Sequence, residues 1–151
     1  MARRWKVVIG AMILVPLGVA AYFGYVGFYM LRHIPEAYAA WDTGTLLVEY
    51  MASHDGRWPS SWDDVRATLH SDSEHQIKLR GAGTNDTDYV LSLAKRVAVD
   101  WTFDPSGSGN QIPVTRLDGT KFPLLWQGAD PNEMVRTYLA DRRATNAPQI
   151  R

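Results

Sequence analysis

The sequence predicts an α+β protein in which an N-terminal transmembrane helix continues into an amphipathic helix packed on a small antiparallel sheet, with a further helix near the C-terminus. Three patterns predict this class: an uncharged apolar run over residues 7–31, apolar residues at three- and four-residue steps after Pro35, and alternation from Val97 to Phe103. The first suits a membrane span, the second a helix with one buried face, and the third a half-buried strand.

The apolar run is long enough to cross a bilayer once, because a helix rises about 1.5 Å per residue and the hydrocarbon layer is about 30 Å thick. Arg3, Arg4 and Lys6 precede it, whereas Arg32 alone follows closely. This bias keeps the N-terminus in the cytoplasm. The predicted organisation is a cytoplasmic tail (1–6), a span of the cell (inner) membrane (7–31), an extracytoplasmic domain (32–143) and a disordered tail (144–151).

A cleaved signal peptide is the alternative to a signal-anchor, because Ala37-Tyr38-Ala39 has the small-x-small form that signal peptidase accepts. Against it, the apolar run is longer than the ~7–15 residues of a signal h-region. A buried core helix fits less well still, since a small domain cannot cover a helix that is apolar on all sides. We therefore expect a single-pass anchor.

The charge and cysteine content limit the function classes. The chain has 16 basic and 16 acidic residues, and without Arg3, Arg4 and Lys6 the remainder carries 13 against 16. An acidic domain does not attract nucleic acid. Cysteine is absent, which excludes disulfides and thiolate metal sites. We expect no cofactor. The expected partners are the membrane and, within it, either another membrane protein or a second copy of the chain.

Two helices are expected before the sheet. Pro35 suits the first turn of a helix, and this helix starts so soon after the span that the two can form one long helix. Its apolar stripe ends before Gly56, which suits a left-handed cap. Ser60-Ser61 then stand three residues before Asp63-Asp64, the spacing of a capping box that starts a short helix. The stripe consists of Tyr38, Trp41, Thr45, Val48 and Ala52, and Leu47 and Met51 widen it.

The segment 71–88 is polar and rich in turn-forming residues, apart from a candidate edge strand at 75–80. Residues 86–95 favour another short helix. The alternation over 97–103 then indicates the clearest strand of the chain.

Two more strands are expected at 112–117 and 120–126, because they flank Asp118-Gly119, the preferred dipeptide of a two-residue hairpin. Pro113 and Pro123 suggest that these strands lie at edges. Together with the strand over 97–103 they predict an antiparallel meander. The closing helix starts at Asp130-Pro131-Asn132-Glu133, which supplies a cap, a first-position proline and a reciprocal glutamate. Its inward face consists of Met134, Val135, Tyr138 and Leu139.

An apolar helix that runs into an amphipathic one, then a corner formed by Tyr50 and Gly56-Arg57-Trp58-Pro59, then a small antiparallel sheet, resembles the type IV pilins and the pseudopilins of type II secretion. The resemblance covers the architecture and about twenty residues. It implies a pilin-like fold and membrane placement. A prepilin processing motif is absent from the start of the chain, so the resemblance implies no filament role.

One loop is a candidate calcium site. Asp104, Ser106, Ser108 and Asn110 place oxygen atoms at every second residue with a glycine in the sixth position, as in the first half of a calcium loop. The twelfth position, where a bidentate glutamate is expected, is Thr115. A plain Ser/Gly turn is therefore the favoured interpretation.

Other polar clusters favour structural roles. His70 and His75, with Asp72 and Glu74, match no zinc-binding spacing. Ser53-His54-Asp55 invites a catalytic interpretation, but adjacent side chains near a helix end usually point apart. An enzyme would need His54, Asp55, Asp100 and Asp104 to converge in one pocket.

The candidate contact residues are aromatic and small. Trp58, Trp62 and Trp126 lie at corners or strand ends, where an exposed indole can fill a partner's pocket or stack on a sugar; the alternative is that they close the core. In the span, Ala20, Gly24 and Gly27 share a helical face that suits helix–helix contact. The leading hypothesis is a non-enzymatic component or accessory of an envelope or secretion-type assembly, and the second is an envelope polysaccharide-binding module.

Overall fold

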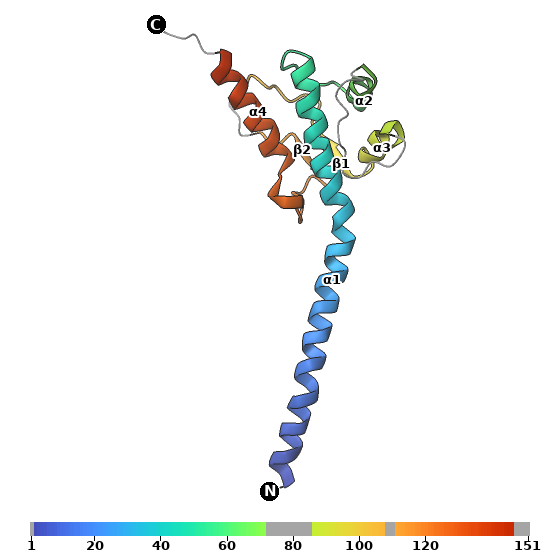
Figure 1. Cartoon of the computed structure of the whole chain (residues 1–151), viewed down its shortest axis with the longest axis vertical. Coiled ribbons are helices and arrows are strands. Elements are labelled where there is room, and N and C mark those ends of the chain that lie inside the picture. The colour runs from blue at the N-terminus through green and yellow to red at the C-terminus, as the bar shows by residue number, and fades with distance from the viewer. Residues whose placement is uncertain (1, 72–85, 108–110, 147–151) are drawn as a thin grey trace. The chain divides into compact units, whose positions relative to one another are not determined.

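The computed structural model describes residues 2–71, 86–107 and 111–146. The chain divides into two compact units, Met1–Ile34 and Pro35–Arg151, which we call the first and the second unit. The long apolar N-terminal helix and the small sheet confirm the α+β class (Figure 1). In chain order the elements are α1 (Ala2–Ser53), α2 (Trp62–Ser71), α3 (Asp86–Leu93), β1 (Val97–Val99), β2 (Val114–Arg116), the 3-10 helix η1 (Trp126–Gly128) and α4 (Pro131–Asn146).

Helix α1 covers both helices that the sequence predicts. The expectation that a helix begins at Pro35 is wrong, because this residue lies inside α1. A proline at this position removes one donor, the N–H that would bond the Leu31 carbonyl, while the turns on either side keep theirs. The end of α1 is as predicted. Gly56 adopts φ +74°, and its N–H donates to the Met51 carbonyl over 2.7 Å, which closes the last turn.

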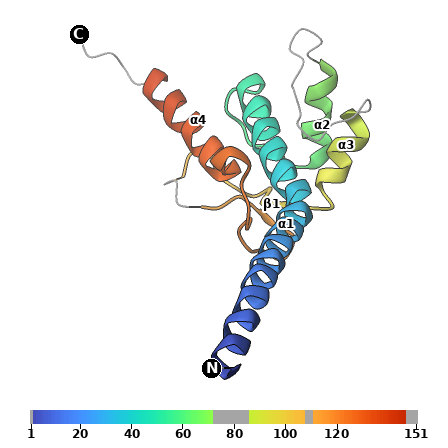
Figure 2. The same ribbon diagram turned by 60° about the horizontal axis from the view of Figure 1, so that its bottom comes forward.

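The core of the second unit lies on the C-terminal part of α1. In Figures 1 and 2, α4 lies on one side of this part, and α2 and α3 lie on the other. Leu46, Leu47 and Met51 of α1 are at most 2% exposed, so α1 buries one face as predicted. The centre of the predicted stripe is displaced from that face, because Tyr38, Trp41, Thr45 and Val48 are half-buried and Ala52 is exposed. The other core residues are Ala39, Val65, Val90, Leu93, Val97, Phe103, Val114, Val135 and Leu139.

Strands β1 and β2 form an antiparallel pair, so the small antiparallel sheet is confirmed. The strand expected over 97–103 is wrong beyond Val99. Residues 100–103 form a turn instead, in which the Phe103 N–H donates to the Asp100 carbonyl over 3.2 Å. The predicted alternation of burial holds from Asp100 to Phe103, where Asp100 and Thr102 are exposed and Phe103 is buried, but Ala98 and Val99 are equally half-buried. The register pairs Val97 with Arg116, Ala98 with Thr115 and Val99 with Val114.

The expected hairpin is reduced to its turn. The Gly119 N–H donates to the Arg116 carbonyl over 2.9 Å, and the Arg116 N–H donates to the Thr120 carbonyl over 3.0 Å. Residues 120–126 do not continue as a strand. Pro123 has no N–H to give to a ladder, and η1 begins shortly after it. The predicted meander is therefore wrong, and the sheet of the described residues has two strands.

Helix α2 begins as predicted, with one difference in its cap. The Asp64 N–H donates to the Ser61 hydroxyl over 3.3 Å, as in a capping box. The Asp64 carboxylate reaches one residue further back and accepts bonds from the backbone N–H and the hydroxyl of Ser60, over 2.9 and 2.6 Å. Helix α3 confirms the short helix expected over 86–95. The candidate strand at 75–80 lies outside the described residues.

Helix α4 also begins at its predicted cap, where the Asp130 carboxylate accepts the Asn132 N–H over 2.8 Å. Glu133 does not reach back to this cap, so that expectation is wrong; its carboxylate pairs with Arg136 over 2.8 Å. The sequence predicts a disordered tail from residue 144, but α4 continues to Asn146.

A glycine sets the distance between α1 and α4. A Cβ at Gly44 would lie 2.9 Å from the Pro131 Cα and 2.9 Å from the Met134 Sδ. Only a residue without a side chain lets the start of α4 pack this closely. Val135 and Leu139 are then buried, as their spacing predicts.

Candidate functional site

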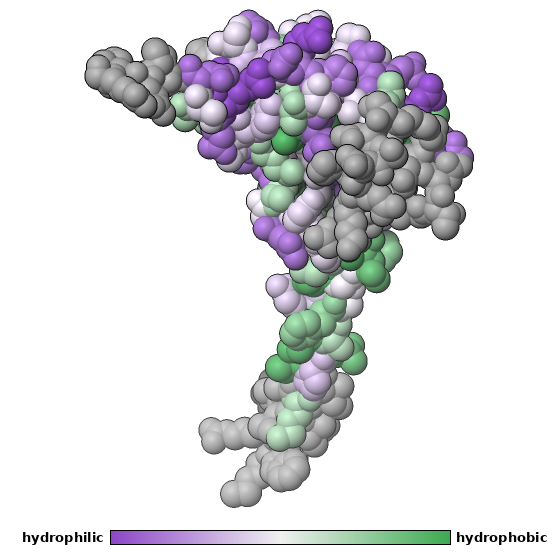
Figure 3. Space-filling view, turned by 45° about the horizontal axis from the view of Figure 1, so that its top comes forward, coloured by the Kyte–Doolittle hydropathy of each residue, from purple (hydrophilic) through white to green (hydrophobic). Residues whose placement is uncertain are grey.

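One stretch of the described residues, Leu14–Ser53 of α1, is long and apolar enough to cross a membrane. Apolar side chains in its N-terminal half are uncovered: Leu14 is 69% exposed, Leu17 67% and Leu31 71%. Figure 3 shows apolar residues gathered along this part of α1, whereas the visible surface of the second unit is largely polar. Water is a poor solvent for such a surface.

The small residues of the predicted helix-contact face are open. Ala20, Gly24 and Gly27 are exposed, and no atom lies within 4 Å of a Cβ built on either glycine. The face is therefore accessible to another helix, and no described residue of the chain covers it.

Trp58 and Trp62 pack on the turn that follows β1. The Trp58 ring meets Phe103 edge to face at 4.7 Å, and its indole N–H donates to the Asp100 carbonyl over 2.9 Å. The Trp62 ring meets Trp101 edge to face at 5.4 Å. We call these four rings the aromatic corner. Both predicted contact residues are half-buried, so they close the core and keep part of each ring at the surface.

Trp126 lies elsewhere in the second unit, in η1. Its ring packs on Tyr38 of α1 with centroids 4.7 Å apart. The indole nitrogen is buried and has no hydrogen-bond partner among the described residues. The structure therefore does not join Trp126 to the aromatic corner.

A repeated local motif shapes the loops and was missed from the sequence. In Asp100-Trp101-Thr102, the carboxylate accepts both the hydroxyl and the N–H of the residue two positions on, over 2.6 and 2.9 Å. Such a side-chain turn competes with the sheet ladder, which explains why β1 stops at Val99. The same pair of bonds occurs in Asp104-Pro105-Ser106 and in Asp118-Gly119-Thr120.

These bonds also set the protonation of the carboxylates. The hydroxyl and N–H of Thr102 hold the pKa of Asp100 below its ordinary value. Ser106 lowers the pKa of Asp104 in the same way, and Thr120 lowers that of Asp118. The Ser60 hydroxyl and N–H lower the pKa of Asp64 at the start of α2. Donors that bond a carboxylate stabilise its charged form, so these four groups are weaker bases than ordinary carboxylates.

The same motif occupies part of the candidate calcium site. One carboxylate oxygen of Asp104 already accepts both bonds from Ser106, and Ser108 and Asn110 lie outside the described residues. In the part of the chain that the structure describes, no group of three or more histidine, aspartate or glutamate side chains is arranged to hold a metal. The side chain of His70 and residues 72–75, the zinc candidates, are likewise outside the described part.

The side chains of Ser53 and His54 are in contact, but their hydrogen bonds do not match those of a catalytic pair. The Ser53 oxygen lies 2.9 Å from His54 Nδ1, but its hydroxyl has backbone acceptors on Glu49 and Tyr50. His54 Nδ1 lies 3.0 Å from the Tyr50 carbonyl, which can only accept. A ring nitrogen that donates there cannot take the serine proton. Asp63 lies in the first turn of α2 and pairs with Arg66 over 3.2 Å.

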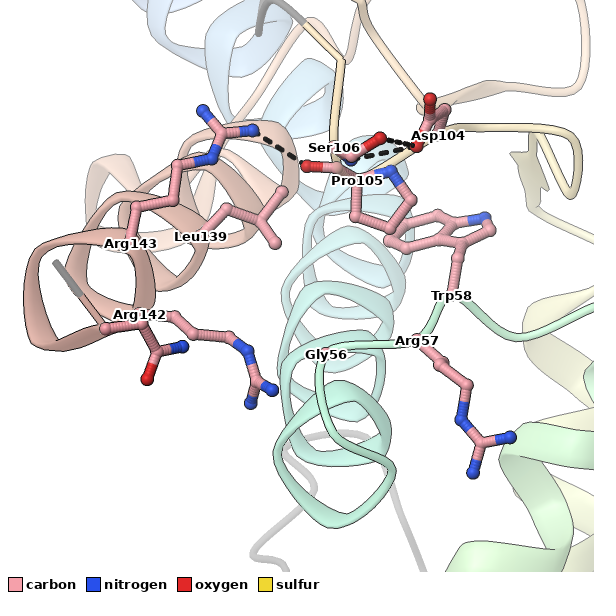
Figure 4. A pocket seen from close by; sticks show the side chains of 10 residues that line it. Gly56, Arg57, Trp58, Asp104, Pro105, Ser106, Leu139, Arg142 and Arg143 are labelled. Carbon is pink, nitrogen blue, oxygen red and sulfur yellow. Dashed lines mark hydrogen bonds between the residues drawn. The ribbon is translucent and has the colours of Figure 1, made fainter. Parts of the chain in front are cut away.

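An open cleft of about 680 Å³ lies between the corner after α1, the 104–106 turn and the end of α4 (Figure 4). We call it the arginine cleft. Sequence reasoning missed it because its walls come from three distant segments, and Arg142-Arg143 was its only local signal. Its lining residues are Gly56, Arg57, Trp58, Asp104, Pro105, Ser106, Leu139, Arg142, Arg143 and Asn146.

No protein-family model, curated protein or solved structure matches the chain.

Proposed function

We propose that this chain is a non-enzymatic, single-pass membrane protein whose second unit lies outside the cytoplasm and serves as a pilin-like component or accessory of an envelope assembly. The observation that carries the proposal is the uncovered apolar surface of α1. Burial of apolar surface is worth roughly 25 cal/mol per Å². Leu14, Leu17 and Leu31, each about two-thirds exposed or more, therefore favour a lipid environment over water.

The flanking charges support the orientation. Arg3, Arg4 and Lys6 lie before the span and Arg32 lies after it. Because cations are retained on the cytoplasmic side, the N-terminus stays inside and the second unit follows on the other face of the cell membrane.

The arrangement of the second unit supports a binding role over catalysis. Asp100 and Asp104 are tied to their own neighbours, and His54 bonds the backbone of α1. The glycine-capped end of α1, followed by Trp58-Pro59 and a short capped helix, supports the pilin-like assignment on its local features. The aromatic corner presents the half-buried Trp62 at the start of α2, and we assign it to contact with a partner protein.

The first test combines membrane extraction with crosslinking in cells. We expect the chain to stay in the membrane pellet through an alkaline carbonate wash and to leave it in detergent. A crosslinker should then give higher-mass species with the wild-type chain and with Leu117→Ala, a control at an exposed turn position, and fewer of them with Trp62→Ala.

Two results would overturn the proposal. Release of the chain by carbonate would remove the anchor. Recovery of monomer alone from wild type and from both variants would remove the assembly role, provided that all three show native circular dichroism.

A further inference from the structure

The arginine cleft joins an apolar floor to a cationic rim. Leu139 of α4, 9% exposed, forms the floor together with the half-buried Pro105 and Trp58. In Figure 4 the Pro105 ring, the Leu139 side chain and the Trp58 indole lie around the same space. An apolar floor of this kind suits an aliphatic or aromatic side chain rather than a bare ion.

Arg142 lies over the turn that ends α1. A Cβ at Gly56 would lie 2.7 Å from its Nε and 3.1 Å from its Cζ, so the guanidinium rests directly on the glycine turn. The side chain is half-buried. No hydrogen bond or ion pair joins its guanidinium to any described residue. A half-buried guanidinium with unused donors matches the two oxygens of a carboxylate.

The other two arginines add charge around this point. One terminal nitrogen of Arg143 donates to the carbonyls of Pro105 and Gly107 over 2.8 and 3.0 Å, which fixes its guanidinium on the rim. Arg57 donates through Nε to the His54 carbonyl over 3.2 Å and leaves its terminal nitrogens in solvent. In Figure 4 the Arg57 side chain points away from Arg142, so it contributes at a longer distance.

The charge of the cleft is opposite to that of the unit that carries it. Residues 35–151 hold 12 basic and 16 acidic side chains, a net charge of −4, whereas the lining holds three arginines and one carboxylate. That carboxylate, Asp104, points toward Ser106 and is bonded to it. A cationic cleft in an acidic domain focuses attraction on anionic partners.

We propose that the arginine cleft binds an acidic peptide segment of a partner protein, in which an apolar side chain occupies the Leu139 floor and a neighbouring carboxylate pairs with Arg142. The inference rests on the proposed role in an assembly and names the chemistry of the contact. The apolar floor favours a peptide over a small oxyanion, which would use the arginines alone.

The test is a titration of the full chain in a non-ionic detergent. The probe is a peptide in which glutamates alternate with leucines, and the reporter is the indole N–H resonance of Trp58, identified by its loss in Trp58→Phe. We expect a saturable shift that weakens as salt is raised, because screening reduces attraction between exposed charges. Loss of a charge-assisted hydrogen bond should weaken binding of Arg142→Gln about 10-fold or more.

Matched controls separate a site from general charge attraction. Arg96→Gln removes an exposed arginine outside the cleft and should bind like wild type. The same peptide with lysines in place of glutamates should not bind, and inorganic phosphate should bind far more weakly than the acidic peptide. Because Arg142 also packs on Gly56, Arg142→Lys serves as a second variant that keeps the charge and should retain part of the affinity.

Each contrary result is decisive. The absence of a saturable shift, equal binding by Arg142→Gln, equal binding of the lysine peptide, or binding of phosphate as tight as that of the peptide would overturn the proposal. The assay uses purified chain and reads the cleft alone. A negative peptide titration would therefore leave the carbonate and crosslinking results unaffected. A negative result in those two experiments would likewise be seen independently of the titration.

Discussion

The side-chain amide of Asn132 bonds both backbone polar groups of Val114. The Val114 N–H donates to the Asn132 Oδ1 over 2.9 Å, and the Asn132 Nδ2 donates to the Val114 carbonyl over 2.9 Å. Both residues are buried. The amide therefore stands where the backbone of a third strand would pair, and it attaches the start of α4 to the outer edge of β2.

Replacement of Asn132 should be costly for this reason. Asn132→Leu leaves a buried N–H and a buried C=O without partners, at about 1–3 kcal/mol for each group. Asn132→Asp keeps the acceptor for the Val114 N–H, but it loses the donors to the Val114 carbonyl and to the Asp130 carboxylate and places a buried negative charge against both. We expect chemical denaturation of the detergent-solubilised chain to show that both variants are less stable than wild type. Equal stability of all three would contradict the role assigned to the amide.

Gly44→Ala should destabilise the second unit although alanine is the better helix former. The new methyl would overlap the Pro131 backbone, and overpacking costs about 1–3 kcal/mol, more than the ~1 kcal/mol that alanine gains in a helix. Gly18→Ala is the matched control, since its Cβ would meet nothing within 4 Å. Thermal unfolding followed by near-UV circular dichroism should show a lower midpoint for Gly44→Ala alone, and an unchanged midpoint would show that α4 can move aside.

Acid should weaken the fold through the aspartate turns. The pKa values of Asp100, Asp104 and Asp118 are lowered in the folded chain, so their contribution is present above the unfolded aspartate pKa of about 3.9. It is lost as the pH falls through the lower, folded values. Urea midpoints measured from about pH 5 to about pH 2 should therefore decrease.

Asparagine variants isolate this effect. Asp100→Asn, Asp104→Asn and Asp118→Asn keep a side-chain oxygen for the turn and cannot titrate. The combined variant should show a shallower loss of stability in acid than wild type. An identical acid profile would assign the loss to other carboxylates.

Local signals in the sequence predicted where the helices of the second unit start and stop. Ser61 with Asp64, Asp130 before Pro131, and Gly56 each act within one turn of their own position, and the structure places a cap at each. The alternation from Val97 to Phe103 predicted the burial of both end residues correctly, and it predicted the backbone correctly only as far as Val99. Alternating burial suits both an extended strand and a strand followed by a turn, and the Asp100 side chain decides between them.

Long-range contacts escaped prediction for a physical reason. The buried carboxylate of Asp42 accepts the Tyr89 hydroxyl over 2.6 Å across 47 positions of the chain, and no local spacing reports such a pair. The arginine cleft has the same origin, because Gly56 and Arg142 meet only after α4 has packed on α1. The tryptophans were found as a group, but their separation into the aromatic corner and Trp126 depends on tertiary packing.

The membrane placement of the chain can be measured directly because the sequence contains no cysteine. Two single-cysteine variants suffice: Leu117→Cys, at a position 59% exposed in the second unit, and Ala2→Cys before the span. A membrane-impermeant maleimide applied to intact cells should label Leu117→Cys, and it should label Ala2→Cys only after lysis. Protection of Leu117→Cys until lysis would contradict the account.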